Sequence, residues 1–232
     1  MIIGGWQKVS LIDYPGKVSC VLFVSGCNFN CPYCHNPQLV KRGRLRSFFI
    51  DEQTVYDYLD NRKGLLDGVV ISGGEPTIRQ ELIYLCKKVK KIGYPIKLDT
   101  NGSRPKVIKQ LIEKDLIDYI AMDIKTDPFH YSPLIKKGQN PNHILASIQI
   151  IMESALAYEF RTTCVKPFVD AKIIRNIAKI IEGAMLYTLQ PFNNSKVLHP
   201  EFFKATNPGY EEDELMDLKS LAEPWVQSCI IR

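Results

Sequence analysis

Short apolar runs alternate with longer amphipathic segments along most of the chain. The apolar runs are rich in β-branched and aromatic residues and are bounded by turn-forming residues, which is typical of buried strands. They predict six strands, at Val18–Val24, Gly68–Ser72, Ile96–Thr100, Tyr119–Lys125, Phe160–Val165 and Leu186–Phe192.

The segments between these strands repeat their apolar residues at helical spacing. They predict helices at Glu52–Asn61, Ile78–Ile92, Lys106–Lys114, His143–Glu159 and Lys172–Glu182, and an acidic segment predicts a terminal helix at Glu211–Leu221. Thr77 and Gln80 lie three residues apart and predict a capping box that opens the second of these helices.

The alternation of β and α elements favours a parallel sheet with right-handed crossovers, so the chain is assigned to the α/β class. Six strands are too few for an eight-stranded barrel, and we expect an open or partial (β/α)6 barrel. No internal repeat, long linker or low-complexity tract interrupts the pattern. We therefore expect one domain over residues 1–232, with a core at about 18–192 and a C-terminal extension at about 193–232.

Polar residues occupy one face of several strands that should be buried on both faces. Because side chains alternate along a strand, the residues that share a face are Lys97 with Asp99, Asp123 with Lys125, Arg161 with Thr163, and Thr188 with Gln190. Buried charges are costly without partners, so these positions form either salt bridges across the barrel or a polar lumen for a charged ligand. We favour the ligand, because the charges lie beside glycine-containing turns at strand ends, where parallel sheets place their sites.

Composition and charge narrow the class of protein. With 45% hydrophobic and 24% charged residues the chain has an ordinary globular composition. The net charge of +5 is mild and partly concentrated in Lys87–Lys91, which fits a solvated helix face rather than nucleic-acid binding. No apolar stretch approaches the roughly 20 residues of a membrane span, and no signal-peptide pattern is present at the N-terminus. We expect a cytoplasmic protein that binds neither nucleic acid nor membrane.

Seven cysteines in such a protein favour metal or redox chemistry over disulfides. Cys27, Cys31 and Cys34 follow the first predicted strand at a spacing that lets three thiolates converge on one soft metal centre. A fourth cysteine is missing locally, whereas closed zinc and electron-transfer sites usually have four protein ligands. One position of the predicted metal centre therefore stays open for chemistry.

Other sites with similar spacing explain the cysteine run less well. Cys31 and Cys34 alone resemble the dithiol of a glutaredoxin, which is a much shorter protein and leaves Cys27 without a role. Cys31 to His35 matches a c-type haem attachment motif, which belongs mostly to exported proteins. A zinc site that adds His35 requires adjacent residues on one ion, and a zinc deaminase requires an upstream His-x-Glu that is absent.

A second motif, Ile71–Thr77, ends the second predicted strand with two glycines, a glutamate and a proline. The glycines let the backbone approach a ligand closely. Alone, the motif is compatible with an ordinary strand-to-helix turn. It gains weight because it follows the cysteines by about forty residues.

Together, these motifs resemble the radical S-adenosylmethionine (SAM) superfamily, in which a CxxxCx-aromatic-C run holds a [4Fe-4S] cluster. The fourth iron of that cluster takes the amino and carboxylate groups of SAM. The turn Gly73–Pro76 is similar to the family element that binds the amino group. Leu98–Gly102 and Met122–Lys125 are similar to strand ends of its activase branch, where acidic residues and a lysine surround the ligand and, in some members, a monovalent cation.

The resemblance implies a role for each matching position. Cluster ligands are Cys27, Cys31 and Cys34, and cofactor contacts are Tyr33, His35, Gly73, Gly74, Glu75, Asp99, Thr100, Asn101, Asp123, Lys125 and Gln190. Asp99, Thr100 and Asp123 are the positions implied for the cation, and His199 is a further candidate for the adenosine site.

Trp6–Lys17 and Cys34–Pro37 further resemble the activating enzymes of glycyl-radical proteins, most of all the longer form of the anaerobic ribonucleoside-triphosphate reductase activating protein. One cluster is implied, because Gln38–Ile50 is short and cysteine-free where some relatives insert a ferredoxin-like segment. The resemblance implies an enzyme that reductively cleaves SAM and removes a Cα hydrogen from a glycine of a partner protein, with flavodoxin or ferredoxin as electron donor.

Three other functions stay open from the sequence. They are activation of a pyruvate formate-lyase-like partner, a radical reaction on a small molecule or peptide, and a non-catalytic iron–sulfur electron carrier. The turn at Gly73–Pro76 and the charged strand ends argue against the carrier.

Overall fold

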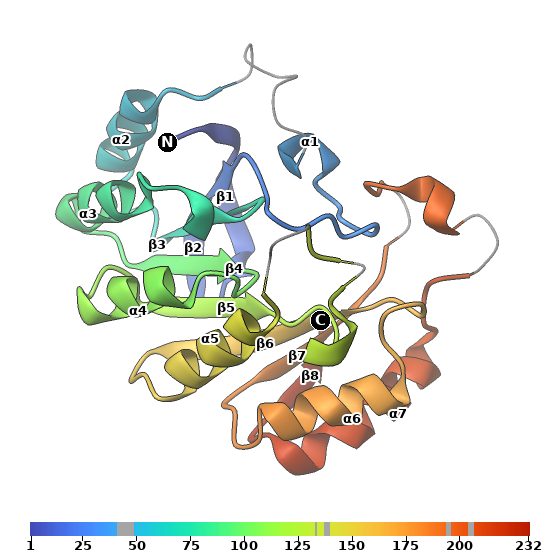
Figure 1. The fold of residues 1–232 in the computed structure, drawn as a ribbon. Coiled ribbons are helices and arrows are strands. Elements are labelled where there is room, and N and C mark those ends of the chain that lie inside the picture. Colours follow the sequence, from blue (N-terminus) through green and yellow to red (C-terminus); the bar gives the residue numbers. More distant parts are fainter. Residues whose placement is uncertain (41–48, 133, 137–139, 194–195, 204–206) are drawn as a thin grey trace.

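The computed structural model describes residues 1–40, 49–132, 134–136, 140–193, 196–203 and 207–232. Within these residues eight strands form one sheet in chain order (Figure 1). The strands are β1 (Ile3–Tyr14), β2 (Lys17–Val24), β3 (Gly68–Gly73), β4 (Ile96–Thr100), β5 (Tyr119–Asp123), β6 (Ala157–Cys164), β7 (Tyr187–Pro191) and β8 (Cys229–Ile231). β1 runs antiparallel to β2, and every later neighbouring pair is parallel.

Helices connect the parallel strands and flank one face of the sheet (Figure 1). In chain order they are α1 (Pro37–Val40), α2 (Glu52–Asn61), α3 (Leu82–Ile92), α4 (Pro105–Glu113), α5 (Asn142–Met152), α6 (Ala171–Ile180) and α7 (Glu212–Ala222). Short 3-10 helices lie at η2 (Pro76–Ile78), η3 (Pro128–His130), η4 (Pro200–Phe203) and η5 (Glu223–Trp225).

Local sequence signals explain where several elements begin and end. The β1–β2 hairpin turns at Gly16, whose φ of +70° suits glycine. Asp170 caps α6 by accepting a hydrogen bond from the Ile173 backbone N–H at 2.8 Å. α3 ends at Gly93, which has a φ of +111°.

The sheet does not close on itself, because β1 and β8 stay unpaired with each other among the described residues. The predicted partial barrel is confirmed, and all six predicted strands form β2 to β7. Two further strands, β1 and β8, were not predicted from the sequence. β1 is an edge strand whose Leu11 and Ile12 are 75% and 79% exposed, so its apolar positions do not alternate. β8 has three residues, too few for a pattern.

Two predicted helices were too long. α3 begins at Leu82, and the predicted capping box is wrong, because the Thr77 backbone N–H and hydroxyl donate to the Glu75 carboxylate. The helix predicted to Glu159 ends at Met152, and β6 begins at Ala157, opposite Tyr119 of β5. The pairing with β5 outweighs the helical spacing in this segment.

The two faces of the sheet differ in character. Cys20, Leu22 and Val24 of β2 join the main apolar core with the helices. Val21 and Val70 point to the opposite face, where they pack with Tyr14 in a separate small cluster. This inner face is thus apolar at β1 to β3 and becomes charged from β4 onward.

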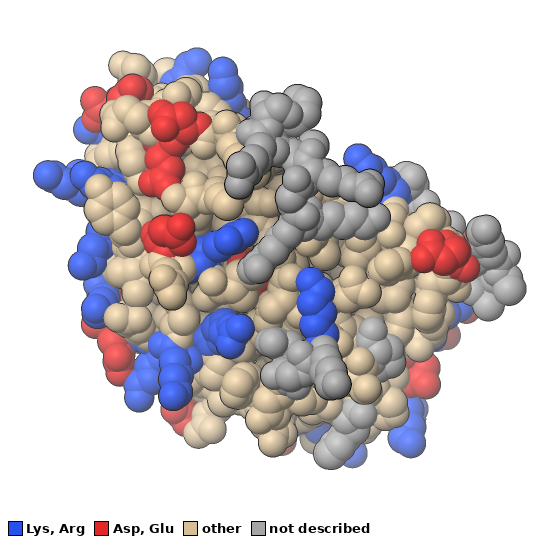
Figure 2. Space-filling view, turned by 45° about the horizontal axis from the view of Figure 1, so that its top comes forward, with Lys and Arg blue, Asp and Glu red and all other residues tan. Residues whose placement is uncertain are grey.

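On the face shown in Figure 2, basic and acidic side chains are interspersed. Within the described residues, no helix has the length and apolarity needed to cross a membrane.

Candidate functional site

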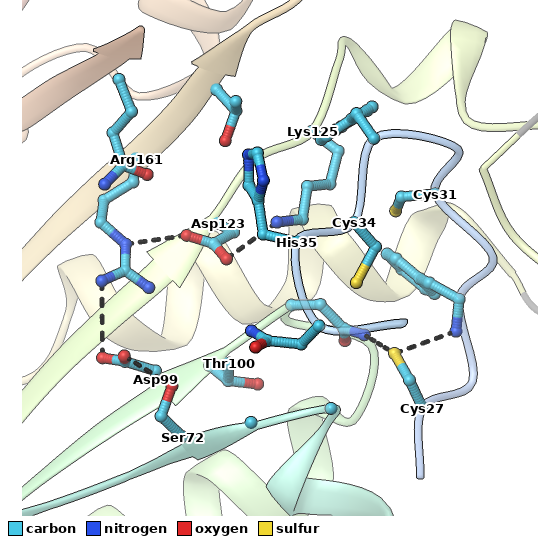
Figure 3. A pocket seen from close by; sticks show the side chains of 18 residues that line it. Cys27, Cys31, Cys34, His35, Ser72, Asp99, Thr100, Asp123, Lys125 and Arg161 are labelled. Atoms are coloured by element: carbon cyan, nitrogen blue, oxygen red, sulfur yellow. Dashed lines mark hydrogen bonds and ion pairs between the residues drawn. The ribbon is translucent and has the colours of Figure 1, made fainter. Parts of the chain in front are cut away.

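A cavity of about 250 Å³ lies where the cysteine-containing loop meets the C-terminal ends of the parallel strands (Figure 3). Its walls come from the loop after β2 and from the ends of β3, β4, β5, β6 and β7. In parallel α/β folds this edge of the sheet is the usual place for a ligand.

Contacts from distant parts of the chain hold the cysteine loop. The Gly26 backbone N–H donates to Leu39 O at 2.5 Å, and the Arg79 guanidinium donates to the carbonyl of Ser25. The Asn30 backbone N–H donates to Leu134 O at 2.8 Å, and Lys136 Nζ donates to Cys27 O at 2.8 Å. The loop is therefore positioned by the segments after β2, β3 and β5.

The three thiols of the loop are largely shielded from water. Burial, together with the nearby Glu75 carboxylate, raises the pKa of Cys27 to about 11, and burial raises the pKa of Cys31 to about 12. Burial also raises the pKa of Cys34. Metal ligation requires thiolates, so binding of iron here displaces protons from groups that otherwise keep them.

The arrangement of the thiols suits a multinuclear cluster. The sulfur atoms of Cys27, Cys31 and Cys34 face a common space in Figure 3. Among the described residues, no three His, Cys, Asp or Glu side chains lie close enough to hold a single ion. An iron–sulfur cluster binds each thiolate through a different iron, so its ligands stand farther apart than those of one ion. Three soft thiolates on one loop are the kind of donor set that holds an iron–sulfur cluster.

Two further observations support a bound group in the cavity. The Tyr33 hydroxyl is buried and has no hydrogen-bond partner among the described residues, although Tyr33 lines the cavity. Cys27 Sγ accepts hydrogen bonds from the Phe29 backbone N–H at 3.3 Å and from Asn101 Nδ2 at 3.9 Å, which stabilise a thiolate.

The turn after β3 brings its backbone against the cysteine loop. Gly73 has a φ of +116°, and a Cβ on Gly74 would lie 2.2 Å from Gly26 O, so both positions require glycine. The Gly74 backbone N–H donates to Val24 O, and the Glu75 N–H donates to Gly26 O.

Glu75 does not line the cavity and is fully buried. Its carboxylate accepts hydrogen bonds from the Thr77 and Asn101 backbone N–H groups and from the Thr77 and Thr100 hydroxyls. Burial nevertheless raises its pKa. Glu75 thus ties together the ends of β3 and β4.

The charged strand ends form ion pairs along one wall of the cavity (Figure 3). Arg161 Nε lies 2.8 Å from Asp123 Oδ1, and Arg161 Nη1 lies 3.6 Å from Asp99 Oδ1. Lys125 Nζ lies 2.8 Å from Asp123 Oδ2. Burial alone would raise the pKa of Asp123, but Arg161 and Lys125 hold it well below its usual range. The predicted polar lumen and the predicted salt bridges therefore coexist.

The structure gathers nearly all the predicted site residues around the cavity. Those that line it are Cys27, Cys31, Tyr33, Cys34, His35, Gly73, Gly74, Asp99, Thr100, Asn101, Asp123, Lys125 and Gln190. Glu75 does not line it, and neither does His199, whose Nε2 lies 3.2 Å from Asn30 Nδ2. The His199 backbone N–H also donates to Pro32 O, so His199 supports the cysteine loop from outside.

Five lining residues were not predicted as site residues. They are Phe29, Asn36, Ser72, Arg161 and Thr163. Arg161 and Thr163 belong to the charged strand face that the alternation identified, so that signal could have found them.

Comparison with known proteins connects this geometry to a family. Residues 21–179, more than half of the chain, match the family described as the Radical SAM superfamily. The chain belongs to the radical SAM superfamily. As a radical SAM enzyme it uses a [4Fe-4S] cluster and SAM, and the dithiol, haem and zinc alternatives are set aside.

Relatives narrow the type of radical SAM enzyme. A Methanocaldococcus jannaschii protein, named as a glycyl-radical enzyme activating enzyme, is 36% identical over 100% of this chain and 95% of its own length. A pyruvate formate-lyase-activating enzyme of Clostridium pasteurianum is 28% identical over 76% of this chain and 74% of its own length. The chain is a radical SAM enzyme of the glycyl-radical activating type, which sets the electron-carrier alternative aside.

Solved structures share the fold. SuiB of Streptococcus suis, bound to its precursor peptide SuiA, superposes with a TM-score of 0.68 and 13% identity over 91% of this chain and 48% of its own. QueE of Escherichia coli has a TM-score of 0.60 and 12% identity over 100% of this chain and 93% of its own. At these identities the likeness concerns the open α/β barrel only.

Proposed function

We propose that this radical SAM enzyme installs a glycyl radical in a partner enzyme by removing a Cα hydrogen from one glycine. The observation that carries the proposal is the meeting of three buried thiols and the ion-paired strand ends of β4, β5 and β6 in one cavity. When bound, the cluster supplies one electron for the cleavage of SAM, and this is the source of the radical.

The residues of the chain bind and orient these groups. We assign Cys27, Cys31 and Cys34 as cluster ligands, which leaves one iron for SAM. The remaining cofactor contacts are assigned to the other predicted residues on the cavity wall, Tyr33, His35, Gly73, Gly74, Asp99, Thr100, Asn101, Asp123, Lys125 and Gln190. Lys125 would present a positive charge to an anionic group of the bound ligand, Arg161 holds Asp123 in place, and the walls would shield the reacting atoms from water.

Glu75 and His199 have indirect roles in this proposal. Glu75 fixes the backbone of Asn101 and Thr77, and His199 fixes the loop between two cluster ligands. Both act as positioning residues, because neither touches the cavity.

The partner we propose is an anaerobic ribonucleoside-triphosphate reductase. Support comes from the similarity of Trp6–Lys17 and Cys34–Pro37 to its activating protein, and the cysteine-free segment Gln38–Ile50 supports a single cluster. Most of that last segment, residues 41–48, lies outside the described residues. A pyruvate formate-lyase-like partner is the second candidate, favoured by the similarity to the Clostridium pasteurianum enzyme.

Further parts of the proposal concern the cellular setting. We propose flavodoxin or ferredoxin as the electron donor and the cytoplasm as the location, where seven free cysteines stay reduced. We also propose that the chain works as one domain, since one sheet takes strands from Ile3 to Ile231.

The test is anaerobic incubation of the iron-loaded enzyme with reductant, SAM and each candidate partner. The expected result is 5'-deoxyadenosine and methionine together with a glycyl-radical electron paramagnetic resonance signal in one partner. The Cys31→Ser enzyme and a partner whose target glycine is alanine serve as controls, and neither mixture should give the signal.

Each other result has a distinct meaning. Cleavage of SAM with no radical in any glycyl-radical partner would support a reaction on a small molecule or peptide instead. No cleavage by an iron-loaded enzyme would contradict the proposed function.

A further inference from the structure

The three positions that the family resemblance implies for a monovalent cation are already bonded to the protein itself. Thr100 Oγ1 donates to Glu75 Oε1 at 2.8 Å. Asp99 Oδ2 accepts from the Ser72 hydroxyl at 2.9 Å, and Asp99 Oδ1 lies 2.5 Å from Lys97 Nζ. Both oxygens of Asp123 are engaged with basic side chains. These residues therefore do not fit a metal cation.

Arg161 occupies the space between the two carboxylates. Its guanidinium bonds Asp123 through Nε and lies 3.6 Å from Asp99 through Nη1, as the dashed lines of Figure 3 show. The side chains of Arg161 and Asp99 are each 12% exposed, so their attraction is weakly screened by solvent. An arginine keeps its charge at every physiological pH, so it stays in this position as a cation.

The charge balance around Arg161 also disfavours another cation. The connected ion pairs join three carboxylates, Asp99, Asp123 and Glu159, with four basic side chains, Lys97, Lys125, Arg161 and Arg232. The group carries an excess of one positive charge. Adding a potassium or sodium ion would increase the repulsion, whereas adding a carboxylate would relieve it.

We propose that Arg161 takes the place of a monovalent cation in this enzyme, so that the cavity binds SAM equally well with or without potassium or sodium. Arg161 is thus a positioning residue that holds Asp99 and Asp123 together at the ends of β4 and β5. The proposal rests on the proposed function in one respect, namely that SAM is the ligand of the cavity.

The first experiment needs no ligand and uses thermal unfolding of the full chain. The melting temperature is measured in potassium, sodium and choline chloride at equal ionic strength, because a cation that binds the folded state raises it by mass action. The wild type should melt at the same temperature in all three salts. In Arg161→Gln the ion-paired group loses its excess positive charge, and Asp99 and Asp123 lose the partner they share. A small cation should then bind between them, so this variant should melt higher in potassium or sodium than in choline.

The second experiment measures the dissociation constant of SAM for the iron-loaded enzyme in the same three salts. The wild-type constants should agree within about twofold. For Arg161→Gln we expect about tenfold weaker binding in choline, largely restored by potassium or sodium, because two buried carboxylates lose their shared partner. Arg161→Lys keeps the charge and should remain insensitive to the salt.

The outcomes separate this proposal from the proposed function. A wild-type melting temperature or affinity that rises with potassium or sodium, but not with choline, would overturn the role of Arg161 even if SAM is cleaved. Wild-type enzyme that melts at the same temperature in all three salts but never binds SAM would contradict the proposed function. It would still support the conclusion that the cavity binds no potassium or sodium ion. If Arg161→Gln does not fold, the salt dependence of the melting temperature and of SAM affinity in the wild type and in Arg161→Lys still tests the role of Arg161.

Discussion

Two groups of charged residues inside the sheet share their chemistry and differ in their surroundings. The inner group consists of Lys97, Glu159 and Arg232. Lys97 is 1% exposed and Glu159 is fully buried, and none of the three lines the cavity. Glu159 Oε2 lies 2.8 Å from Arg232 Nη2, and Glu159 Oε1 lies 3.9 Å from Lys97 Nζ. Lys97 Nζ also lies 2.5 Å from Asp99 Oδ1, so this group pairs within itself and with one carboxylate of the cavity wall.

The cavity group consists of Asp99, Asp123, Lys125 and Arg161. Its members pair just as closely, but all four line the cavity beside the thiols. Ion pairing therefore does not distinguish structure from function here. The position at the C-terminal strand ends does, because only there is space left for a ligand.

The largest expected effect is on the thiols that the cavity group faces. Cys27→Ser, Cys31→Ser or Cys34→Ser should each abolish the cluster, since a hydroxyl replaces a soft thiolate ligand. Iron content and the absorption of the reconstituted protein measure it. Cys229→Ala, a buried cysteine of β8, is the matched control and should keep its iron. Full iron content with undiminished SAM cleavage in any of the three serine variants would refute the assignment.

The next effect separates ligand binding from cluster binding. Asp123→Ala should keep the cluster but weaken SAM binding by about tenfold or more, because Arg161 and Lys125 lose the carboxylate that orients them. Equilibrium binding to the iron-loaded protein measures it. Asp213→Ala, on the exposed side of α7, should bind SAM as the wild type does. Unchanged affinity in Asp123→Ala would remove this residue from the site.

A change in the inner group should lower the stability of the fold but leave the affinity for SAM nearly unchanged. Glu159→Gln should lower the free energy of unfolding by about 2–4 kcal/mol, because Arg232 and Lys97 lose a buried counter-charge. Its SAM affinity should stay within about twofold of the wild type. Urea unfolding and equilibrium binding of SAM together test this prediction. A large loss of SAM affinity in a stably folded variant would contradict the conclusion that the inner group serves the fold and the cavity group serves the ligand.

The smallest expected effect is on acid stability. Burial alone would raise the pKa of Asp99 and Asp123, but the basic partners hold both below their usual range. Their stabilising contribution is thus present above the unfolded pKa of about 3.9 and is lost as the pH falls further. The stability gap between wild type and Arg161→Gln should narrow by about 1–2 kcal/mol between about pH 6 and about pH 3. Urea unfolding of the cluster-free proteins measures it, and a constant gap would contradict the ion pairing.

Much of the fold followed from the sequence. Strands β2 to β7 are recognisable because each is short and has an apolar face, which is buried against helices of the same chain. The two missed strands lacked that signal. β1 exposes apolar residues at its edge, and β8 gains its strand character only from pairing with β7.

The candidate site was predicted less evenly. Gly73 is required by its φ of +116° and Gly74 by its close approach to Gly26, and both constraints can be recognised in the sequence as a pair of glycines. The sequence does not show which groups the Glu75 carboxylate contacts. Its carboxylate turns inward to four donors on the ends of β3 and β4, and those donors meet only in the folded chain.

By itself, the sequence determined the cysteine spacing, the glycine turn and the charged face of the central strands. These are local properties, since a spacing of three or four residues or an alternation of two is set by backbone geometry. Only the tertiary structure decided which charges pair and which face the cavity. Arg161 reaches Asp99 and Asp123 because the register of three strands aligns them, and His199 supports the cysteine loop because the chain returns there after β7. Such contacts join residues far apart in sequence, so no local sequence pattern predicts them.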